Sequence, residues 1–251
     1  MFTHGISCIA LYKNEEGIPH LIFGEAWNHI QIMNLDTRQI LTASKSLIEE
    51  NAEEKHIEFY KKHEEHNKLP WPSPYDYFFG KLFLSPNQKK FLSAGWFWGS
   101  CDGFNVYDIE AFIHSNRISE LRVGTWEHEN RATCWIDNET IAVVYNPFTE
   151  GDENSTKDSP MEIHFYKING NNVEMEKKIQ IADKNSLSSI FFDRERKSFI
   201  TFSYKEGLTM ISFDGQVIFK DKDLKVNEYN AETNLFLRTD NKSISVYEIT
   251  K

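Results

Sequence analysis

The sequence has few cysteines and no long apolar run. Its 251 residues include only three cysteines, Cys8, Cys101 and Cys134, which are widely spaced. An odd number of distant cysteines is not the pattern of a disulfide framework or a zinc site, so we expect reduced thiols in a cytoplasmic protein. No segment approaches the ~20 apolar residues of a membrane-spanning helix. The first residues also lack the basic and apolar regions of a signal peptide.

Basic residues are fewer than acidic ones. The chain has 28 Lys and Arg against 38 Asp and Glu, a formal net charge of -10. Affinity for nucleic acid comes from Lys and Arg, so we do not expect nucleic acid as a partner. Without a membrane-spanning run, we expect no membrane as a partner either. An acidic surface keeps a protein soluble and attracts basic partners.

Aromatic residues, by contrast, are abundant, with 19 Phe, 10 Tyr and 6 Trp. They fit the half-buried faces of a sheet and favour an all-β fold. Five segments share an alternation of apolar residues with period two, which is typical of strands: residues 30–35, 104–109, 163–168, 208–213 and 244–249. Four of them follow a hairpin with a polar turn, at residues 83–92, 135–143, 190–200 and 229–237. These units form a repeat.

The spacing of the repeat predicts its size. The later intervals are close to the ~40 to 45 residues of a four-stranded propeller blade. The longer, earlier intervals contain insertions, a charged segment at residues 44–68 with a proline-rich exit and an acidic loop at residues 149–160. Ser46 and Glu49 form a capping box, which predicts a helix in the first insertion.

The chain resembles the WD40-like β-propellers, most closely the divergent bacterial members. The resemblance rests on the repeat and on the Ser-Pro-x-x-x-Lys-x-Leu pattern of residues 85–92, and it covers most of the chain outside residues 44–76. It departs from the family because no Gly-His or Trp-Asp dipeptide occurs. It implies one domain, residues 1–251, of about five four-stranded antiparallel blades around a central channel, with residues 44–76 as a helical and proline-rich insertion.

One strand has two possible places. Residues 6–12 could complete the last blade, as N-terminal strands do in many propellers, or they could begin the first blade. The sequence does not separate these alternatives.

The densest aromatic and polar grouping is the candidate binding site. Its members are Trp71, Tyr75, Tyr77, Trp96, Trp98 and Asp102. One interpretation is structural: these rings pack between two blades. The other is functional: they form a surface that binds a ligand or a partner, since rigid aromatic residues dominate binding hot spots.

We expect no metal, cofactor or catalytic residue. His63 and His66 on the predicted helix lack the spacing of zinc hydrolases, and no nucleophile elbow or phosphate-binding glycine loop occurs. Five-bladed propellers include glycoside hydrolases, which need paired carboxylates. The candidates would be Asp76, Asp102, Asp137, Glu139 and Asp193, but the last three fall in hairpin turns, where such residues are common.

The function favoured by the sequence is a monomeric, non-catalytic scaffold for protein–protein interaction. Two alternatives remain open. One is a bacterial immunity-type protein that neutralises a basic toxin, which the acidic charge suggests. The other is a carbohydrate-active hydrolase with carboxylates in its channel.

Overall fold

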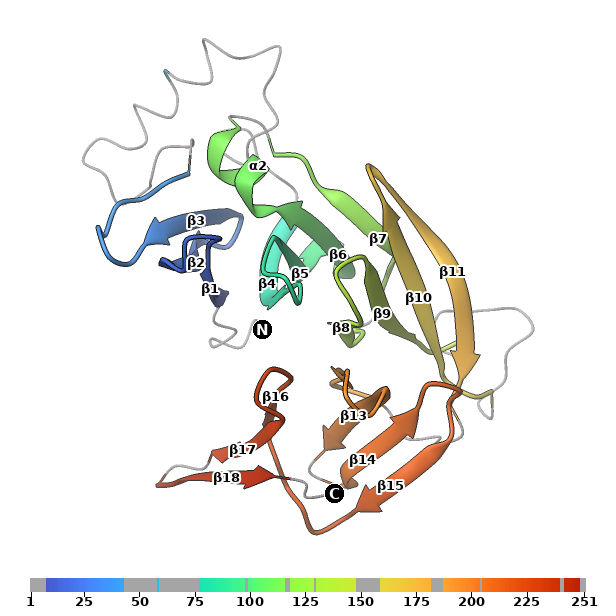
Figure 1. Cartoon of the computed structure of the whole chain (residues 1–251). Helices are drawn as coiled ribbons and strands as arrows, with labels where there is room; N and C mark the ends of the chain where they lie inside the picture. The colour runs from blue at the N-terminus through green and yellow to red at the C-terminus, as the bar shows by residue number, and fades with distance from the viewer. Residues whose placement is uncertain are drawn as a thin grey trace. The chain divides into compact units, whose positions relative to one another are not determined.

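The computed structural model describes residues 8–42, 58, 77–97, 99–115, 118–128, 130–147, 159–181, 187–203, 205–239 and 242–248 (Figure 1). Strands make up nearly all of its regular structure. The short helix α2 (Ile109–His114) begins after Asp108, whose Oδ1 accepts a hydrogen bond from Ala111 N at 2.9 Å. The predicted all-β class is confirmed.

The strands form five antiparallel sheets of consecutive segments. Sheet A holds β1 (Ile9–Lys13), β2 (Pro19–Ala26) and β3 (His29–Asn34). Sheet B holds β4 (Tyr77–Leu84), β5 (Lys90–Phe97), β6 (Cys101–Asp108) and β7 (Leu121–Glu127). Sheet C holds β8 (Thr133–Trp135), β9 (Thr140–Tyr145), β10 (Glu162–Asn169) and β11 (Asn172–Gln180). Sheet D holds β12 (Phe191–Asp193), β13 (Ser198–Ser203), β14 (Gly207–Ser212) and β15 (Val217–Asp221). Sheet E holds β16 (Glu228–Asn230), β17 (Leu235–Thr239) and β18 (Ile244–Glu248).

The repeat found in the sequence maps onto these sheets. The five alternating segments are β3, β6, β10, β14 and β18, the third strand of each sheet in chain order. The four hairpins are β4–β5, β8–β9, β12–β13 and β16–β17, as predicted. Five such meanders are the blades of a five-bladed β-propeller. Among the described residues, sheets A and E have three strands each instead of the predicted four.

The first strand belongs to the first sheet. β1 pairs with β2 in the antiparallel register that runs from Ile9 opposite Phe23 to Lys13 opposite Pro19. The alternative in which this segment completes the last blade is therefore wrong for residues 9–13. On its other side, sheet A is extended by the bridge between Met33 and Ile40.

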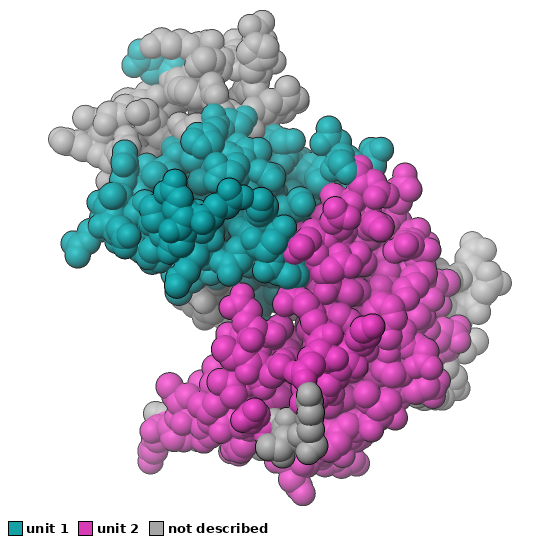
Figure 2. Space-filling model, in the orientation of Figure 1, with its two compact units in different colours: residues 1–127, 170–173 teal, residues 128–169, 174–251 magenta. Residues whose placement is uncertain are grey.

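The chain divides into two compact units, coloured separately in Figure 2. Unit 1 comprises residues 1–127 and 170–173, and unit 2 comprises residues 128–169 and 174–251. The single domain over residues 1–251 stays a prediction. The insertion at residues 44–76 lies outside the described residues, Glu58 apart.

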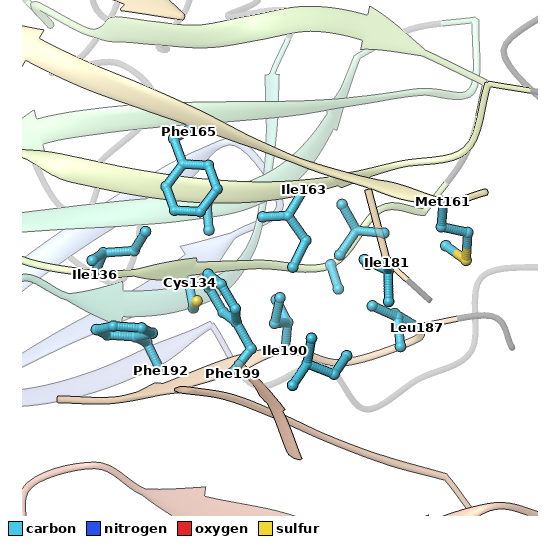
Figure 3. Close-up of a cluster of buried hydrophobic side chains, with 14 residues drawn as sticks. Cys134, Ile136, Met161, Ile163, Phe165, Ile181, Leu187, Ile190, Phe192 and Phe199 are labelled. Atoms are coloured by element: carbon cyan, nitrogen blue, oxygen red, sulfur yellow. The ribbon is translucent and has the colours of Figure 1, made fainter. Parts of the chain in front are cut away.

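Each unit has its own apolar core. In unit 1, residues of sheets A and B and of α2 pack together, and Ile22, Tyr77 and Phe91 are fully buried. In unit 2, phenylalanines gather at one end of the cluster in Figure 3, and Met161 and Leu187 lie at the other. Burial of each large apolar side chain contributes about 1.5 to 3 kcal/mol, so these clusters hold the sheets together.

In sheet B, β4 and β5 approach too closely for any side chain. A Cβ at Gly80 would lie 1.8 Å from the Ala94 carbonyl oxygen, and one at Gly95 would lie 2.2 Å from the Phe78 carbonyl oxygen. The register of β4 against β5 shifts between Phe78 and Lys81, which marks a bulge. Only glycine fits at positions 80 and 95, because the backbones of the two paired strands are so close there.

The edge strand β11 of sheet C carries a cation over two phenylalanine rings. Lys177 Nζ lies 4.4 Å from the centroid of Phe165 and 3.9 Å from that of Phe213. Phe213 is 37% exposed and Phe165 is buried. The lysine thus contacts the end of the unit 2 core through a cation–π interaction.

Candidate functional site

The turn between β2 and β3 lies against the beginning of β4. Phe79 N donates a hydrogen bond to the Trp27 carbonyl oxygen at 2.8 Å. The Trp27 ring stacks on Phe78 with centroids 4.3 Å apart and planes 25° from parallel. Trp27 is nevertheless 50% exposed. This contact joins sheets A and B within unit 1 and presents aromatic surface where they meet.

A row of directly opposed residues crosses sheet B beside this contact. Phe78 lies opposite Trp96, and Trp96 lies opposite Asp102, which lies opposite Glu127. Opposed residues share one face of a sheet, so Trp96 and Asp102 are neighbours, as the sequence suggested. Trp96 is half-buried. Asp102 is buried, and its Oδ1 accepts a hydrogen bond from Glu127 N at 3.2 Å.

The other face of sheet B carries a second aromatic stack. Phe97 and Trp126 stack with ring centroids 4.1 Å apart, and Arg122 Cζ lies 4.2 Å from the Trp126 centroid. Trp126 is 43% exposed. We call Trp27, Phe78, Trp96, Phe97, Arg122 and Trp126 together the aromatic end of unit 1. Of these six residues, the sequence analysis had singled out only Trp96.

The remaining predicted site residues fall into two groups. Tyr77 is fully buried, and its hydroxyl lies 2.7 Å from the Ser93 carbonyl oxygen and 3.1 Å from that of Gly103. These contacts anchor the ring inside sheet B. Trp71, Tyr75 and Trp98 lie outside the described residues, so their place in the site stays a prediction.

Sheet A contains a buried polar cluster under the Trp27 turn. We call it the Glu25 cluster; its members are Glu25, His29, Gln31 and Thr42. Glu25 Oε2 lies 3.3 Å from His29 Nε2, and Gln31 Nε2 lies 3.1 Å from Glu25 Oε2 and 2.8 Å from His29 Nε2. Thr42 Oγ1 contacts Gln31 Oε1. The side chains of His29 and Glu25 are 0% and 3% exposed, so this pair is buried.

Sheet C contains another glutamate–histidine pair, with a different environment. Glu162 Oε2 lies 2.8 Å from His164 Nε2, and Glu162 Oε1 accepts from Lys178 Nζ at 3.1 Å. The His164 ring stacks on Tyr145 with centroids 4.6 Å apart. Each carboxylate oxygen therefore has its own donor.

Two of the carboxylates considered for hydrolysis, Asp137 and Asp193, accept hydrogen bonds within turns. Asp137 Oδ1 accepts hydrogen bonds from Glu139 N and Thr140 N, both at 2.8 Å. Asp193 Oδ1 accepts from Glu195 N and Arg196 N, both at 3.0 Å. These are the local bonds of turn-forming residues. Asp76 lies outside the described residues.

The three cysteines, all within the described residues, form no disulfide bond. Burial raises the pKa of Cys8 to about 12 and also raises the pKa of the fully buried Cys134, because desolvation disfavours the thiolate. Neither thiol is therefore activated as a nucleophile. Among the described residues, no three His, Cys, Asp or Glu side chains gather as metal ligands, and His63 and His66 lie outside that part.

The described helices include none long and apolar enough to cross a membrane.

Comparisons with known proteins find likeness in fold. No family model matches the chain, and no curated protein matches it. Among solved structures, 445 chains match. One, from the crystal structure of a mitotic checkpoint complex, is 8% identical with a TM-score of 0.48. That match covers 88% of this chain and 55% of the other, so this chain spans about half its length. The WD40-like resemblance stays a prediction from the sequence.

Proposed function

We propose that this protein is a non-catalytic scaffold that binds another protein through the aromatic end of unit 1. The exposure of Trp27 and Trp126, 50% and 43%, is the observation that carries the proposal. Tryptophan and arginine are the residues most enriched among binding hot spots. Both tryptophans are held rigid by stacking, on Phe78 and on Phe97, so a partner loses little side-chain entropy on binding them.

The proposal extends to the residues identified in the sequence. Trp71, Tyr75 and Trp98 lie beside the aromatic end in the sequence and are proposed to complete its surface. Tyr77 and Asp102 support it from beneath, since Tyr77 anchors β4 and Asp102 accepts a hydrogen bond from β7. Their replacement would act on binding through the fold.

The experiment is affinity capture with matched variants. The wild-type chain, the double variant Trp27→Ala/Trp126→Ala and the control Met175→Ala are each used as bait in lysate of the native host. Met175 is a suitable control because it is 53% exposed and lies in unit 2. We expect one stoichiometric protein with the wild type and the control, and its loss with the double variant. A partner retained equally by all three baits would refute this binding site.

The dependence of binding on ionic strength distinguishes a partner bound through aromatic rings from a basic partner bound through charge. Capture is repeated at low and moderate ionic strength, where exposed ion pairs are screened and apolar contacts are not. A partner bound through aromatic rings stays bound at moderate salt. A basic partner lost at moderate salt would favour the immunity-type alternative, in which the net charge of -10 provides the attraction.

A further inference from the structure

Arg122 contacts both rings of the Phe97–Trp126 stack. Its Cζ lies 4.2 Å from the Trp126 centroid and 5.5 Å from that of Phe97, within the ~6 Å range of a cation–π interaction. Phe97 is itself held by sheet B, since a Cβ added at Gly103 would lie 2.3 Å from its ring. The guanidinium therefore lies against rings that are fixed in place.

The backbone of β7 bulges between Arg122 and Trp126. Against the single residue Gly103 of β6, β7 has three residues, 124–126, and Gly124 takes a positive φ of 69°. In a regular strand, the Cα atoms of residues 122 and 126 would be about 13 Å apart. The bulge shortens this separation and lets the two side chains meet. The contact is thus built on the outermost strand of sheet B.

No carboxylate accompanies this cation in the part of the chain that the structure describes. There the interactions of the Arg122 guanidinium are with the two rings, and the residue directly opposite, Asn105, is neutral. Asn105 Oδ1 is buried and has no hydrogen-bond partner among the described residues, so Arg122 does not turn inward to donate to it. Arg122 is exposed, and its N–H donors face a partner molecule instead.

These donors define the chemistry of the group that would bind. Guanidinium has five N–H donors in a planar fork that matches both oxygens of a carboxylate. Phosphate groups on proteins are bound by clusters of arginines, whereas the aromatic end of unit 1 includes one cation. Since the rings restrict the side chain, little rotamer freedom is lost when a carboxylate binds. A carboxylate beside an apolar side chain therefore fits Arg122 and Trp126 together.

We propose that the aromatic end of unit 1 binds an acidic segment of the partner protein. The carboxylate of an Asp or Glu side chain in that segment pairs with Arg122, and an adjacent apolar side chain contacts Trp126. This inference rests on the proposed function, because it specifies the partner of the same site.

The charge of the whole chain makes this pairing selective. The formal net charge is -10, so most of the surface repels an acidic segment. Attraction is confined to the place where an arginine is presented, which favours one docking position over the others. A basic segment has the opposite preference, because Arg122 repels it.

The test is selection from a display library of random peptides, with the immobilised full chain as the target. The targets are the wild type, Trp27→Ala/Trp126→Ala and Arg122→Glu. We expect the wild type to select peptides enriched in Asp or Glu next to apolar residues. Arg122→Glu should select Lys or Arg in place of the acidic residue, and the double variant should select neither class.

The outcomes distinguish this inference from the proposed function. If the wild type selects no peptide, or the double variant selects the same peptides as the wild type, both are refuted. If the selected peptides need the two tryptophans but show no acidic enrichment, only the carboxylate pairing is refuted. The same holds if Arg122→Glu still selects acidic peptides.

Titrations with one selected peptide measure the pair itself. The peptide and its counterpart with the acidic residue changed to the amide are added to the wild type, Arg122→Gln and Lys177→Gln, and tryptophan fluorescence is followed. Lys177 is the matched control, because it is an exposed cation over two rings but lies in unit 2.

We expect Arg122→Gln to bind the acidic peptide about 3-fold to 10-fold more weakly than the wild type does. The amide peptide should bind the wild type and Arg122→Gln equally, since the pair is already broken. Lys177→Gln should bind as the wild type does. Equal losses in the two variants would indicate a general effect of net charge and overturn the pairing with Arg122.

Discussion

Sheets B and E are built from the same repeat, and they differ most in what their side chains do. Sheet B has four strands, and Tyr77, Phe91 and Tyr107 are at most 1% exposed. Sheet E has three described strands, with Phe236 1% exposed but Ile244 and Val246 on β18 exposed at 73% and 57%. The comparison teaches that the repeat specifies strand order, while the number of buried rings determines how firmly a sheet is held.

The largest expected effect comes from removing one fully buried ring in each sheet. Phe91→Ala in sheet B deletes a ring that contacts Tyr107 and Phe112, and should cost about 4 to 5 kcal/mol of unfolding free energy. Phe236→Ala in sheet E removes a ring that contacts Tyr229, and should cost about 3 kcal/mol because the thinner sheet can relax around the cavity. Denaturant unfolding measures both. Equal losses would remove the distinction between the sheets.

A slightly smaller loss of unfolding free energy is expected at the close approach of the paired strands β4 and β5. Gly95→Ala places a Cβ 2.2 Å from the Phe78 carbonyl oxygen and 2.6 Å from the Tyr77 ring, and should cost about 3 kcal/mol. The matched control is Gly17→Ala, where no atom lies within 4 Å and only the positive φ of 80° is strained. That control should lose about 1 kcal/mol. An unchanged unfolding free energy of Gly95→Ala would show that the backbones of β4 and β5 are not so close at this position.

Tyr229 on β16 of sheet E gives a pH-dependent effect. Burial, with the nearby charge of Asp193, raises the pKa of Tyr229 to about 12 from an ordinary value of 10.0. The unfolded chain therefore ionises first, and the stabilising contribution of neutral Tyr229 is complete below pH 10 and lost as the pH rises to about 12. Thermal unfolding across this range should show a steeper decline for the wild type than for Tyr229→Phe. Parallel curves would contradict the raised pKa.

The smallest effect is expected on the exposed face of β18. Ile244→Ser replaces a side chain that is 73% exposed, so the unfolding free energy should change by less than about 0.5 kcal/mol. Thermal midpoints of the variant and the wild type should coincide. A loss above 1 kcal/mol would show that this face is covered in solution, and sheet E would then be as well packed as sheet B.

The fold could be predicted from the sequence because the third strands carry apolar residues two apart, such as Ile163 and Phe165. The polar hairpins before them mark where the chain turns. The place of β1 was not predictable, because a strand of five residues carries no sign of which sheet it joins. Its pairing with β2 is a tertiary choice.

Only part of the candidate site could be predicted. Trp96 and Asp102 stand out because they lie close in the sequence within an aromatic stretch. Trp126 and Arg122 lie on β7, and only the register of β6 against β7 brings them to Phe97. Trp27, in a turn of sheet A, stacks on Phe78 of sheet B, and the sequence does not show which sheets are neighbours. A tryptophan between two predicted strands is a weak signal that can be sought in other repeats of this kind.

The Glu25 cluster escaped the sequence analysis for a different reason. The bulge that turns Glu25 toward His29 depends on the pairing of Gly24 and Ala26, and no residue pattern announces it. The side chains converge because the backbone bulges at Glu25, and a period-two pattern of apolar residues does not reveal such a bulge.

Lys177, which lies over Phe165 and Phe213, has a consequence for the protein at high concentration. β11 is the outermost strand of sheet C, and a long exposed edge strand is a template on which another chain can add a strand. A fixed ammonium on that edge makes such addition costly, because a second copy would have to bring an identical charge near the first or pull the lysine off its rings. The cation over the rings of unit 2 thus belongs to a charged edge strand, and charged side chains on an edge oppose strand addition.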